Sequence, residues 1–291
     1  MTTPSLYKPR APLRPPPVPP RVVRSRAFDE VRAAAVLDLL EPYLFDHAGF
    51  IELIRDELRS PVSRPRIIEF GCGTGRLTVP ALTTRPDAVY HGFDRSEARL
   101  AITSCKLGGQ GLLRGATLTA PFELDRASIG EALQGLRADF LLLPRFLQTV
   151  PLCATEGGGL HRTAFLAFCQ QLVKPGGRML IIEEVYGEDA AEHACLSRAA
   201  LEAFRARLTA DLPRVRHGLQ GLDPQLAARL GLLPGDPLLL GELRSRAGPA
   251  GAGTQMLPLS AWHRMFEHLG FTYRTLRLES QPQLCLFTVR C

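Results

Sequence analysis

Three glycines at alternate positions, preceded by an acid, are the residues of this chain whose spacing points most directly to chemistry. They lie in the segment 67–75, IIEFGCGTG, where Glu69 stands two residues before Gly71, and Gly73 and Gly75 follow. Glycine lets a backbone turn tightly and approach a ligand where a side chain would collide. The dinucleotide-binding fingerprint places its third glycine one residue later, as G-x-G-x-x-G. The segment therefore predicts a close-approach turn for a nucleoside ligand, distinct from the dinucleotide turn.

A second acid stands where such a ligand needs one. Residues 88–94, AVYHGFD, have the pattern of a short strand that ends on Asp94. In doubly wound folds an acid at the end of the second strand lies beside the ligand and can accept both ribose hydroxyls. The alternative is that Asp94 caps the helix that begins near Ser96. One carboxylate can serve both roles.

The elements that position these residues alternate between strand and helix patterns. Each strand is short and apolar, and each is separated from the next by a segment with helical spacing, which favours a parallel sheet covered on both faces. The last two strands are joined by a short loop and so are expected to be antiparallel neighbours. We expect a doubly wound α/β fold with a seven-stranded, mostly parallel sheet and a reversed last strand. The further segments are strands at 116–119, 140–143, 178–183, 271–278 and 284–289 and helices at 161–173 and 259–269.

The glycine turn, the acid at Asp94 and the helix followed by KPGG at 174–177 resemble class I S-adenosylmethionine-dependent methyltransferases. The resemblance covers about residues 65–185 and 259–291. It implies an enzyme that uses S-adenosylmethionine and binds it beyond the carboxyl ends of the strands.

Cofactor contacts follow from this resemblance, residue by residue. It places the glycine turn on the methionine part of the cofactor and Asp94 on the ribose, with Cys72 serving only as a small residue in the turn. Many relatives carry a polar residue for adenine after the third strand, whereas this chain has Ala120 and Pro121 there. Backbone groups, Phe122 and Glu123 are therefore the candidates for the adenine contact. The implied cofactor-binding set is Glu69, Gly71, Cys72, Gly73, Gly75, Asp94, Arg95, Phe122 and Leu143.

Candidate catalytic residues follow the fifth strand. Methyl transfer is a direct displacement that needs an aligned nucleophile and, for a hydroxyl or an acidic carbon, removal of a proton. The segment EEVYGEDAAEH offers Glu184, Tyr186 and His193, and His193 is favoured as the base because imidazole titrates near neutrality. The alternative for His193 is an exposed helical residue. The N-P-P-Y signature of many amino-methylating enzymes is missing after the fourth strand, which disfavours nucleobase and glutamine substrates.

Two segments outside the sheet are expected to cover the site. Residues 29–60 have the pattern of two helices, the first ended by Pro42. Residues 187–258 form a long insertion before the last helix, with a helical first part and a second part rich in Leu, Pro and Gly. An apolar insertion of this kind suits a lid over a hydrophobic small molecule, and a homodimer surface is the alternative. The proposed methyltransferase domain thus spans residues 29–291.

Charge is concentrated at the beginning of the chain. Residues 1–28 carry six basic residues and no acid, which accounts for the net charge of +6, so the body is formally neutral. A body without a basic surplus argues against nucleic acid as the main substrate. The Pro- and Arg-rich tail is expected to be disordered, with a partner ligand, an electrostatic tether or a strap over the active site as its functional alternatives.

Composition limits the remaining function classes. No run of eighteen apolar residues or secretory signal occurs, and seven unpatterned cysteines favour reduced thiols in a cytoplasmic protein. No metal site is expected, because His263 and His268 do not share a helix face. Three functions stay open: methylation of a largely apolar small molecule, methylation of a protein or carrier-bound substrate recruited by the tail, and a non-catalytic scaffold.

Overall fold

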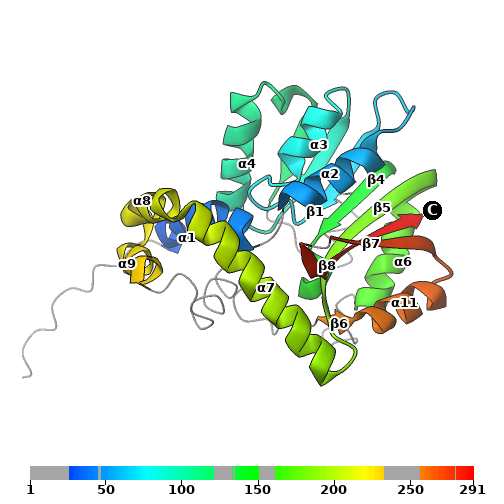
Figure 1. Cartoon of the computed structure of the whole chain (residues 1–291). Coiled ribbons are helices and arrows are strands. Elements are labelled where there is room, and N and C mark those ends of the chain that lie inside the picture. Colours follow the sequence, from blue (N-terminus) through cyan, green and yellow to red (C-terminus); the bar gives the residue numbers. More distant parts are fainter. Residues whose placement is uncertain are drawn as a thin grey trace, which may run out of the picture.

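A seven-stranded sheet forms the centre of the molecule in the computed structural model (Figure 1). The structure describes residues 26–44, 47–120, 133, 135–150, 161–232, 256–278 and 280–291. Along the sheet the strands follow the order β3-β2-β1-β4-β5-β8-β7, and a short strand β6 pairs with β5 beside this path. The bounds are β1 Arg66–Phe70, β2 Val89–Phe93, β3 Ala116–Thr119, β4 Ala138–Pro144, β5 Val173–Tyr186, β6 Leu257–Pro258, β7 Thr272–Leu278 and β8 Gln281–Arg290.

The direction of the strands confirms the predicted fold class. Strands β1 to β5 of the main path pair in parallel, whereas β8 is antiparallel to both β5 and β7. The reversal follows from a tight connection, since Leu278 of β7 already pairs with Gln281 of β8. The hairpin is therefore shorter than the predicted loop at 279–283.

Helices cover both faces of the sheet because alternate strand residues are apolar on both sides. One face packs against α2 (His47–Leu58), α3 (Thr78–Thr84) and α4 (Glu97–Gly109), and the other packs against α6 (Arg162–Leu172) and α11 (Leu259–His268) (Figure 1). On β1 the alternation is direct: Ile67 belongs to the first cluster, and Ile68 and Phe70 belong to the second. Two 3-10 turns, η1 (Leu113–Gly115) and η2 (Leu147–Thr149), follow α4 and β4.

The helices at the beginning of the chain and in the insertion extend the first of these clusters. The long helix α1 (Arg26–Leu44) packs with α7 (Ala190–Ala210) and α8 (Leu212–Leu222), and α9 (Pro224–Leu232) follows α8 (Figure 1). Arg32 donates to the carbonyl of Leu222, and the Tyr43 hydroxyl donates to Asp211 Oδ2 at 2.5 Å. The first part of the insertion is thus helical, as predicted.

The prediction that Pro42 ends the first helix is wrong. Pro42 lies inside α1, which continues to Leu44. Proline removes one backbone donor but does not prevent the last turn from keeping helical angles. That turn is held from outside, because Tyr43 bonds to Asp211 through its hydroxyl and accepts from Arg207 Nε through its carbonyl at 3.1 Å. Tertiary contacts outweigh the local signal here.

The KPGG segment changes direction inside an irregular part of β5. Helix α6 ends at Leu172, as the prediction requires, and pairing with β4 then jumps from Ala138↔Val173 to Phe140↔Arg178. Gly176 adopts a φ of +80°, and its nitrogen donates to the carbonyl of Cys291 at 2.7 Å. The regular part of the strand begins at Arg178, where the sequence places it.

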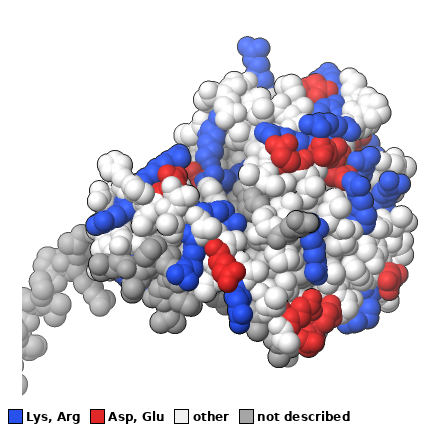
Figure 2. All heavy atoms as spheres, viewed as in Figure 1, with Lys and Arg blue, Asp and Glu red and all other residues white. Residues whose placement is uncertain are grey.

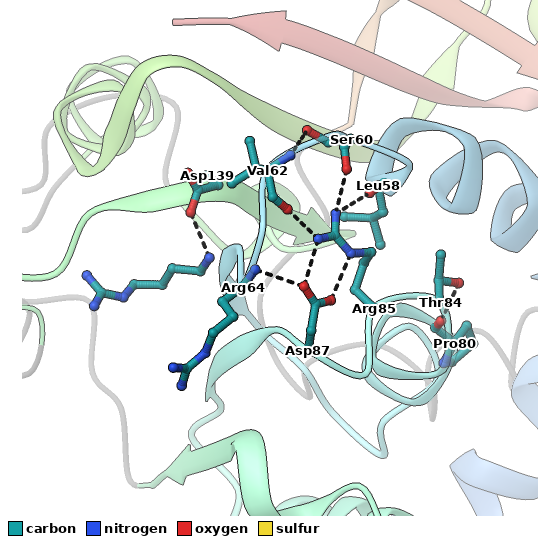
Figure 3. Close-up of polar contacts among 10 residues, drawn as sticks. Leu58, Ser60, Val62, Arg64, Pro80, Thr84, Arg85, Asp87 and Asp139 are labelled. Carbon is teal, nitrogen blue, oxygen red and sulfur yellow. Dashed lines mark hydrogen bonds and ion pairs between the residues drawn. The ribbon is translucent and has the colours of Figure 1, made fainter.

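Arg85 is the centre of a group of polar contacts at the amino ends of β1 and β2, the ends opposite to the glycine turn (Figure 3). The guanidinium of Arg85 donates to the carbonyls of Leu58, Ser60 and Val62. It also pairs with Asp87, whose pKa is lowered to about 2 chiefly by the Arg85 hydrogen bond. The segment between α2 and β1 is therefore held to the end of α3 on this rim.

None of the helices in the described ranges combines the length and apolar character needed to cross a membrane.

Candidate cofactor and active site

The glycine turn lies at the carboxyl end of β1. Gly71, Gly73 and Gly75 all adopt positive φ angles, of +74°, +55° and +80°. At Gly71 the space is also occupied, because an added Cβ would lie 2.8 Å from Cδ2 of Phe146. Residues with a side chain rarely adopt such angles. The three glycines are therefore required by conformation, and Gly71 is required by space as well.

Hydrogen bonds from β2 and α4 fix the backbone of this turn. The nitrogens of Gly71 and Cys72 both donate to the carbonyl of Phe93, at 2.7 and 3.2 Å. Thr103 Oγ1 of α4 donates to the carbonyl of Gly73 at 2.8 Å. Lys106 Nζ donates to the carbonyl of Thr74, also at 2.8 Å. The turn is held at several points before any ligand binds.

Lys106 also connects the turn to the first helix. Its ammonium pairs with Asp38 of α1, and Arg76 of the glycine turn pairs with the same carboxylate at 3.3 Å. Arg76 also lies 3.9 Å from Glu41. The cover helix α1 is therefore linked through charge pairs to the segment predicted to hold the cofactor.

Asp94 follows β2 and faces the same turn. Its Oδ2 accepts from the nitrogen of Gly73 at 2.9 Å, and its Oδ1 accepts from the nitrogen of Ser96, also at 2.9 Å. The residue that caps α4 is Ser96 itself, whose hydroxyl accepts from the nitrogen of Arg99. Ser96, not Asp94, is therefore the N-cap of α4. Arg95, the next predicted contact, is exposed beside it.

Glu69 is buried at the end of β1, with its side chain among hydroxyl groups. Its Oε2 lies 2.5 Å from the Tyr90 hydroxyl and 3.0 Å from the Thr78 hydroxyl. Its Oε1 is buried and has no hydrogen-bond partner among the described residues. Burial raises the pKa of Glu69 to about 7, although the two hydroxyls act in the opposite direction. An unsatisfied buried carboxylate oxygen is costly, so a partner for it is expected.

The segment after β4 closes the other side of the turn. Arg145 adopts a left-handed φ of +53°, and its nitrogen donates to the carbonyl of Ile182 at 2.7 Å. The next residue, Phe146, places its ring 5.7 Å from that of Phe70 and 5.5 Å from that of Phe165. This backbone reversal turns the Phe146 ring against Gly71.

A buried acid supports this segment from β5. Glu183 Oε1 accepts from the nitrogen of Leu147 at 2.6 Å, and burial raises the Glu183 pKa to about 8. The positive charges of Arg162 and Arg145 act on Glu183 in the opposite direction. Arg162 is fully buried and lies 5.3 Å from the centre of the Trp262 ring. Burial lowers its pKa.

The predicted catalytic residues lie at the carboxyl end of β5 and in α7. Glu184 is buried, and Tyr186, half-buried, pairs with Pro258 of β6. Asp189 caps α7 by accepting from the nitrogen of Glu192, which places the backbone of His193 in the first turns of that helix. The side chain of His193 lies outside the described residues. The roles of these three side chains stay predictions.

Phe122 and Leu143 are the remaining predicted cofactor contacts, and the structure describes only Leu143. Phe122 lies outside the described residues, as do residues 1–25 of the predicted tail, whereas residues 26–28 of that tail belong to α1 and are not disordered as predicted. Leu143 is fully buried and packs in the cluster that contains Phe70 and Phe93. Its place at the end of β4 agrees with the prediction, while its side chain supports the core, and its contact with the cofactor stays a prediction.

Several residues of the site were not predicted from the sequence. Tyr90, Thr78 and Phe146 touch the glycine turn or its acid, and Thr103 and Lys106 hold its carbonyls. One signal was available for Tyr90, a polar group in an otherwise apolar strand next to the strand that carries Glu69. For Phe146 and Lys106 the sequence offers none.

Comparisons with known proteins bear on this site. Residues 68–179 match a family model described as a methyltransferase domain. No curated protein matches the sequence. Among solved structures, the chain is similar to an O-methyltransferase family protein from Burkholderia thailandensis, with 14% identity, 84% of this chain and 57% of that chain covered, and a TM-score of 0.48.

Two further structures are similar at the same level. One is an O-methyltransferase family 2 protein from Planctomyces limnophilus in complex with apigenin, with 14% identity, 88% and 64% coverage and a TM-score of 0.47. The other is the N-terminal domain of EvdMO1 with SAH bound, with 15% identity, 84% and 79% coverage and a TM-score of 0.48. The chain spans between half and two thirds of the length of the Burkholderia and Planctomyces proteins. The family match includes the glycine turn, Asp94 and the strands on either side of them, so residues 68–179 match a methyltransferase domain, and the residues of this turn fit S-adenosylmethionine as the cofactor.

Proposed function

We propose that the protein transfers a methyl group from S-adenosylmethionine to a largely apolar small molecule. The observation that carries the cofactor part is the pair of acids at the ends of adjacent parallel strands. Glu69 has a buried oxygen without a partner in the described part of the chain, and Asp94 already accepts from the nitrogen of Gly73. A cationic amino group suits the first acid, and ribose hydroxyls suit the second.

Each side chain then has a defined task. Glu69 accepts the amino group of the methionine part, Asp94 accepts the ribose hydroxyls, and Arg95 flanks the adenine. Phe122 remains a candidate for a further adenine contact, and Cys72 keeps the turn narrow. The bound cofactor supplies a methyl group on a positively charged sulfur, which needs no covalent help from the protein. The protein orients the acceptor and removes its proton where the acceptor requires it.

The choice of acceptor is supported by the elements around the site. Helices α1, α7 and α8 pack against one another, and the rest of the insertion, 233–258, is rich in Leu and Pro. Lys and Arg side chains are interspersed with Asp and Glu over the face shown in Figure 2. Such a surface does not favour a nucleic-acid backbone. We propose that the insertion covers an apolar acceptor. Whether it also mediates a homodimer stays open.

Binding of the cofactor is tested by calorimetric titration with S-adenosylmethionine. We expect saturable binding by the wild type and much weaker binding by Asp94→Ala. The matched control is Asp87→Ala, which removes an acid at the amino end of β2 that makes no contact with the glycine turn. Equal affinity in wild type and Asp94→Ala would remove the basis of the cofactor assignment.

The acceptor class is tested with S-adenosylmethionine labelled in its methyl group and incubated with a cell extract. Label in the organic-soluble, low-molecular-weight fraction supports the proposal, whereas label in protein supports the alternative of a protein or carrier-bound substrate. Removal of residues 1–28 should then leave labelling of a small molecule intact. Once an acceptor is known, His193→Gln tests the base: unchanged turnover would assign that role to Glu184 or Tyr186, or to no residue. Binding without transfer to any fraction would favour the non-catalytic scaffold.

A further inference from the structure

Three oxygen atoms form a closed triangle around the acid of the glycine turn. Glu69 Oε2 lies 2.5 Å from Tyr90 Oη and 3.0 Å from Thr78 Oγ1, and the two hydroxyl oxygens lie 2.9 Å from each other. All three side chains are nearly inaccessible to solvent, at 1%, 0% and 0% exposure. Each pair is within hydrogen-bond distance, and water does not reach the group.

The number of protons decides which state this triangle favours. Three hydrogen bonds need three protons, and the hydroxyls of Tyr90 and Thr78 supply two. If Glu69 is ionised and both hydroxyls donate to it, the contact between the two hydroxyl oxygens has no proton. A neutral Glu69 supplies the third proton, and each oxygen then donates once and accepts once. The closed arrangement is therefore complete only with a protonated carboxyl group.

The surroundings of Glu69 act in the same direction. Its neighbours in the sheet, Gly92 on β2 and Leu142 on β4, carry no charge. Burial is the largest influence on its pKa and raises it, and the negative charges of Asp94 and Glu41 add to this, which together outweigh the lowering by the hydrogen bonds of Tyr90 and Thr78. Cys72 of the glycine turn also faces it, as a thiol whose own pKa is raised by burial.

The cations of the glycine turn and of α4 pair with other groups. Arg76 of the glycine turn pairs with Asp38 and Glu41 of α1. Lys106 of α4 pairs with Asp38 and with the carbonyl of Thr74. The Tyr90 hydroxyl is itself buried, and its pKa is raised, first by burial and then by Glu69. Neither cation is therefore left to pair with a Glu69 carboxylate, which favours the neutral form of this acid.

We propose that Glu69, enclosed in this triangle, is a neutral acid in the cofactor-free protein, and that cofactor binding releases its proton to solvent. Tyr90 and Thr78 are positioning residues, because their hydroxyls stabilise the carboxylate that forms. The proposal rests on the proposed cofactor site. The amino group of the incoming ligand is a cation, so it pairs with the carboxylate, and the proton of the carboxyl group leaves to water. Both hydroxyls then donate to Oε2, while Oε1 receives the ligand.

Ligand affinity must therefore depend on pH through this one group. With the pKa of Glu69 at about 7, affinity at pH 6 should be about fivefold weaker than at pH 7. About 0.9 proton should be released per ligand bound at pH 6, where the amino group of the ligand is fully protonated. This release is a property of the binding step and does not depend on turnover.

The experiment is calorimetric titration of the full chain with S-adenosylhomocysteine at pH 6, in two buffers with different enthalpies of ionisation. The wild type should release close to one proton, and Glu69→Gln close to none, because an amide does not titrate. Glu183→Gln is the matched control, since Glu183 is also a buried acid with a raised pKa but lies outside the triangle. It should leave the proton release unchanged.

Positioning is tested through the two hydroxyls. Thr78→Val and Tyr90→Phe should weaken binding of S-adenosylhomocysteine several-fold at pH 7.5 and shift its pH dependence upward, because the carboxylate loses a donor, and Thr78→Ser should restore both. An infrared difference spectrum gives a second readout on the wild type alone. The carbonyl band of a protonated carboxyl group should disappear when S-adenosylhomocysteine is added at pH 6.

Each outcome has one meaning. Binding by the wild type without proton release, or an equal release by Glu69→Gln, would overturn the role of the triangle and leave the cofactor site in place. No binding by the wild type at any pH would instead overturn the proposed function and, with it, this inference. A proton release that is lost in Glu69→Gln and kept in Glu183→Gln supports both.

Discussion

The carboxylate of Asp94 holds the nitrogen of Gly73 at 2.9 Å, which joins the end of β2 to the turn that follows β1. The second oxygen of the same carboxylate holds the nitrogen of Ser96, where α4 begins. One side chain thus fixes the glycine turn against the next helix. Each of its oxygens keeps a further lone pair, which is what two ribose hydroxyls require.

Replacing Asp94 should therefore weaken cofactor binding in two ways. Asp94→Ala removes the acceptor for the ribose and also releases the Gly73 nitrogen, so we expect a loss of roughly 10- to 100-fold in affinity for S-adenosylmethionine, from hydrogen bonds to a charged group. Asp94→Asn keeps one oxygen but turns an amide donor toward the other backbone nitrogen. Its affinity for S-adenosylmethionine should lie between those of the wild type and Asp94→Ala. Calorimetric affinities measure the series, and circular dichroism checks that each variant is folded.

Gly71 offers a second test with an internal control. Gly71→Ala must adopt a φ of +74° and place its Cβ 2.8 Å from the Phe146 ring, whereas Gly111→Ala adopts a φ of +71° with no atom within 4 Å of the added carbon. Both should lose about 1 kcal/mol of stability from the backbone angle. Only Gly71→Ala should lose more than that, together with most of its cofactor affinity.

The contribution of Phe146 can be separated by a double substitution. Phe146→Ala removes the ring that an alanine at position 71 would strike, so adding it to Gly71→Ala should recover part of the lost stability. Urea unfolding of the two single variants and the double variant measures this coupling. Additive losses would show that the ring does not limit residue 71.

Glu69 should make the cofactor-free protein less stable as pH rises. Its pKa in the folded protein, about 7, is higher than the ordinary value of 4.5. The stability it contributes is therefore fully present below pH 4.5, declines from there to about pH 7, and is absent above. Glu69→Gln does not titrate, so it should be more stable than the wild type at pH 8, by on the order of 1 to 3 kcal/mol.

Urea unfolding at pH 5 and pH 8 measures this difference without any ligand. We expect the gap between wild type and Glu69→Gln to widen toward pH 8, while the variant loses cofactor affinity at both values. A gap that does not change with pH would mean that Glu69 is ionised throughout this range.

Glu183 should matter for the segment after β4. Glu183→Gln keeps an acceptor for the nitrogen of Leu147, whereas Glu183→Leu removes the acceptor and every polar atom of the side chain near buried Arg162. We expect Glu183→Leu to cost roughly 3 kcal/mol and to lower cofactor affinity through a displaced Phe146. Glu183→Gln should behave closer to the wild type. Unfolding and binding measurements on both variants decide this, and equal losses would contradict a role for the hydrogen bond.

The sequence was sufficient for the parts of this site that are local. The turn at Gly71 and the acid at Asp94 follow short strands whose apolar pattern is regular, and parallel strands bring their carboxyl ends to one edge. Strand β3 begins and ends at the predicted residues, Ala116 and Thr119. The local sequence pattern and the order of the strands along the chain were enough to predict these features.

Contacts that depend on register or on strand face were harder to predict. Glu183 and Glu184 are adjacent in the sequence, but successive strand residues point to opposite faces, and it is Glu183 that accepts from Leu147 and is acted on by Arg162. Tyr90 meets Glu69 only because β1 and β2 pair as Ile67↔Tyr90. No local pattern specifies that pairing.

The contacts of α1 affect the order in which the molecule can assemble. Arg32 is bonded to a carbonyl 190 residues later in the chain, and Tyr43 to a carboxylate 168 residues later. During synthesis the ribosome emits α1 first, yet its partners in α7 and α8 appear only after β5 is complete. Contacts between distant segments close slowly because the loop entropy is lost before they form. The nascent protein can therefore place its first helix against α4 through Asp38 and Lys106 early, but the contacts with α7 and α8 close later, before β7 and β8 complete the sheet.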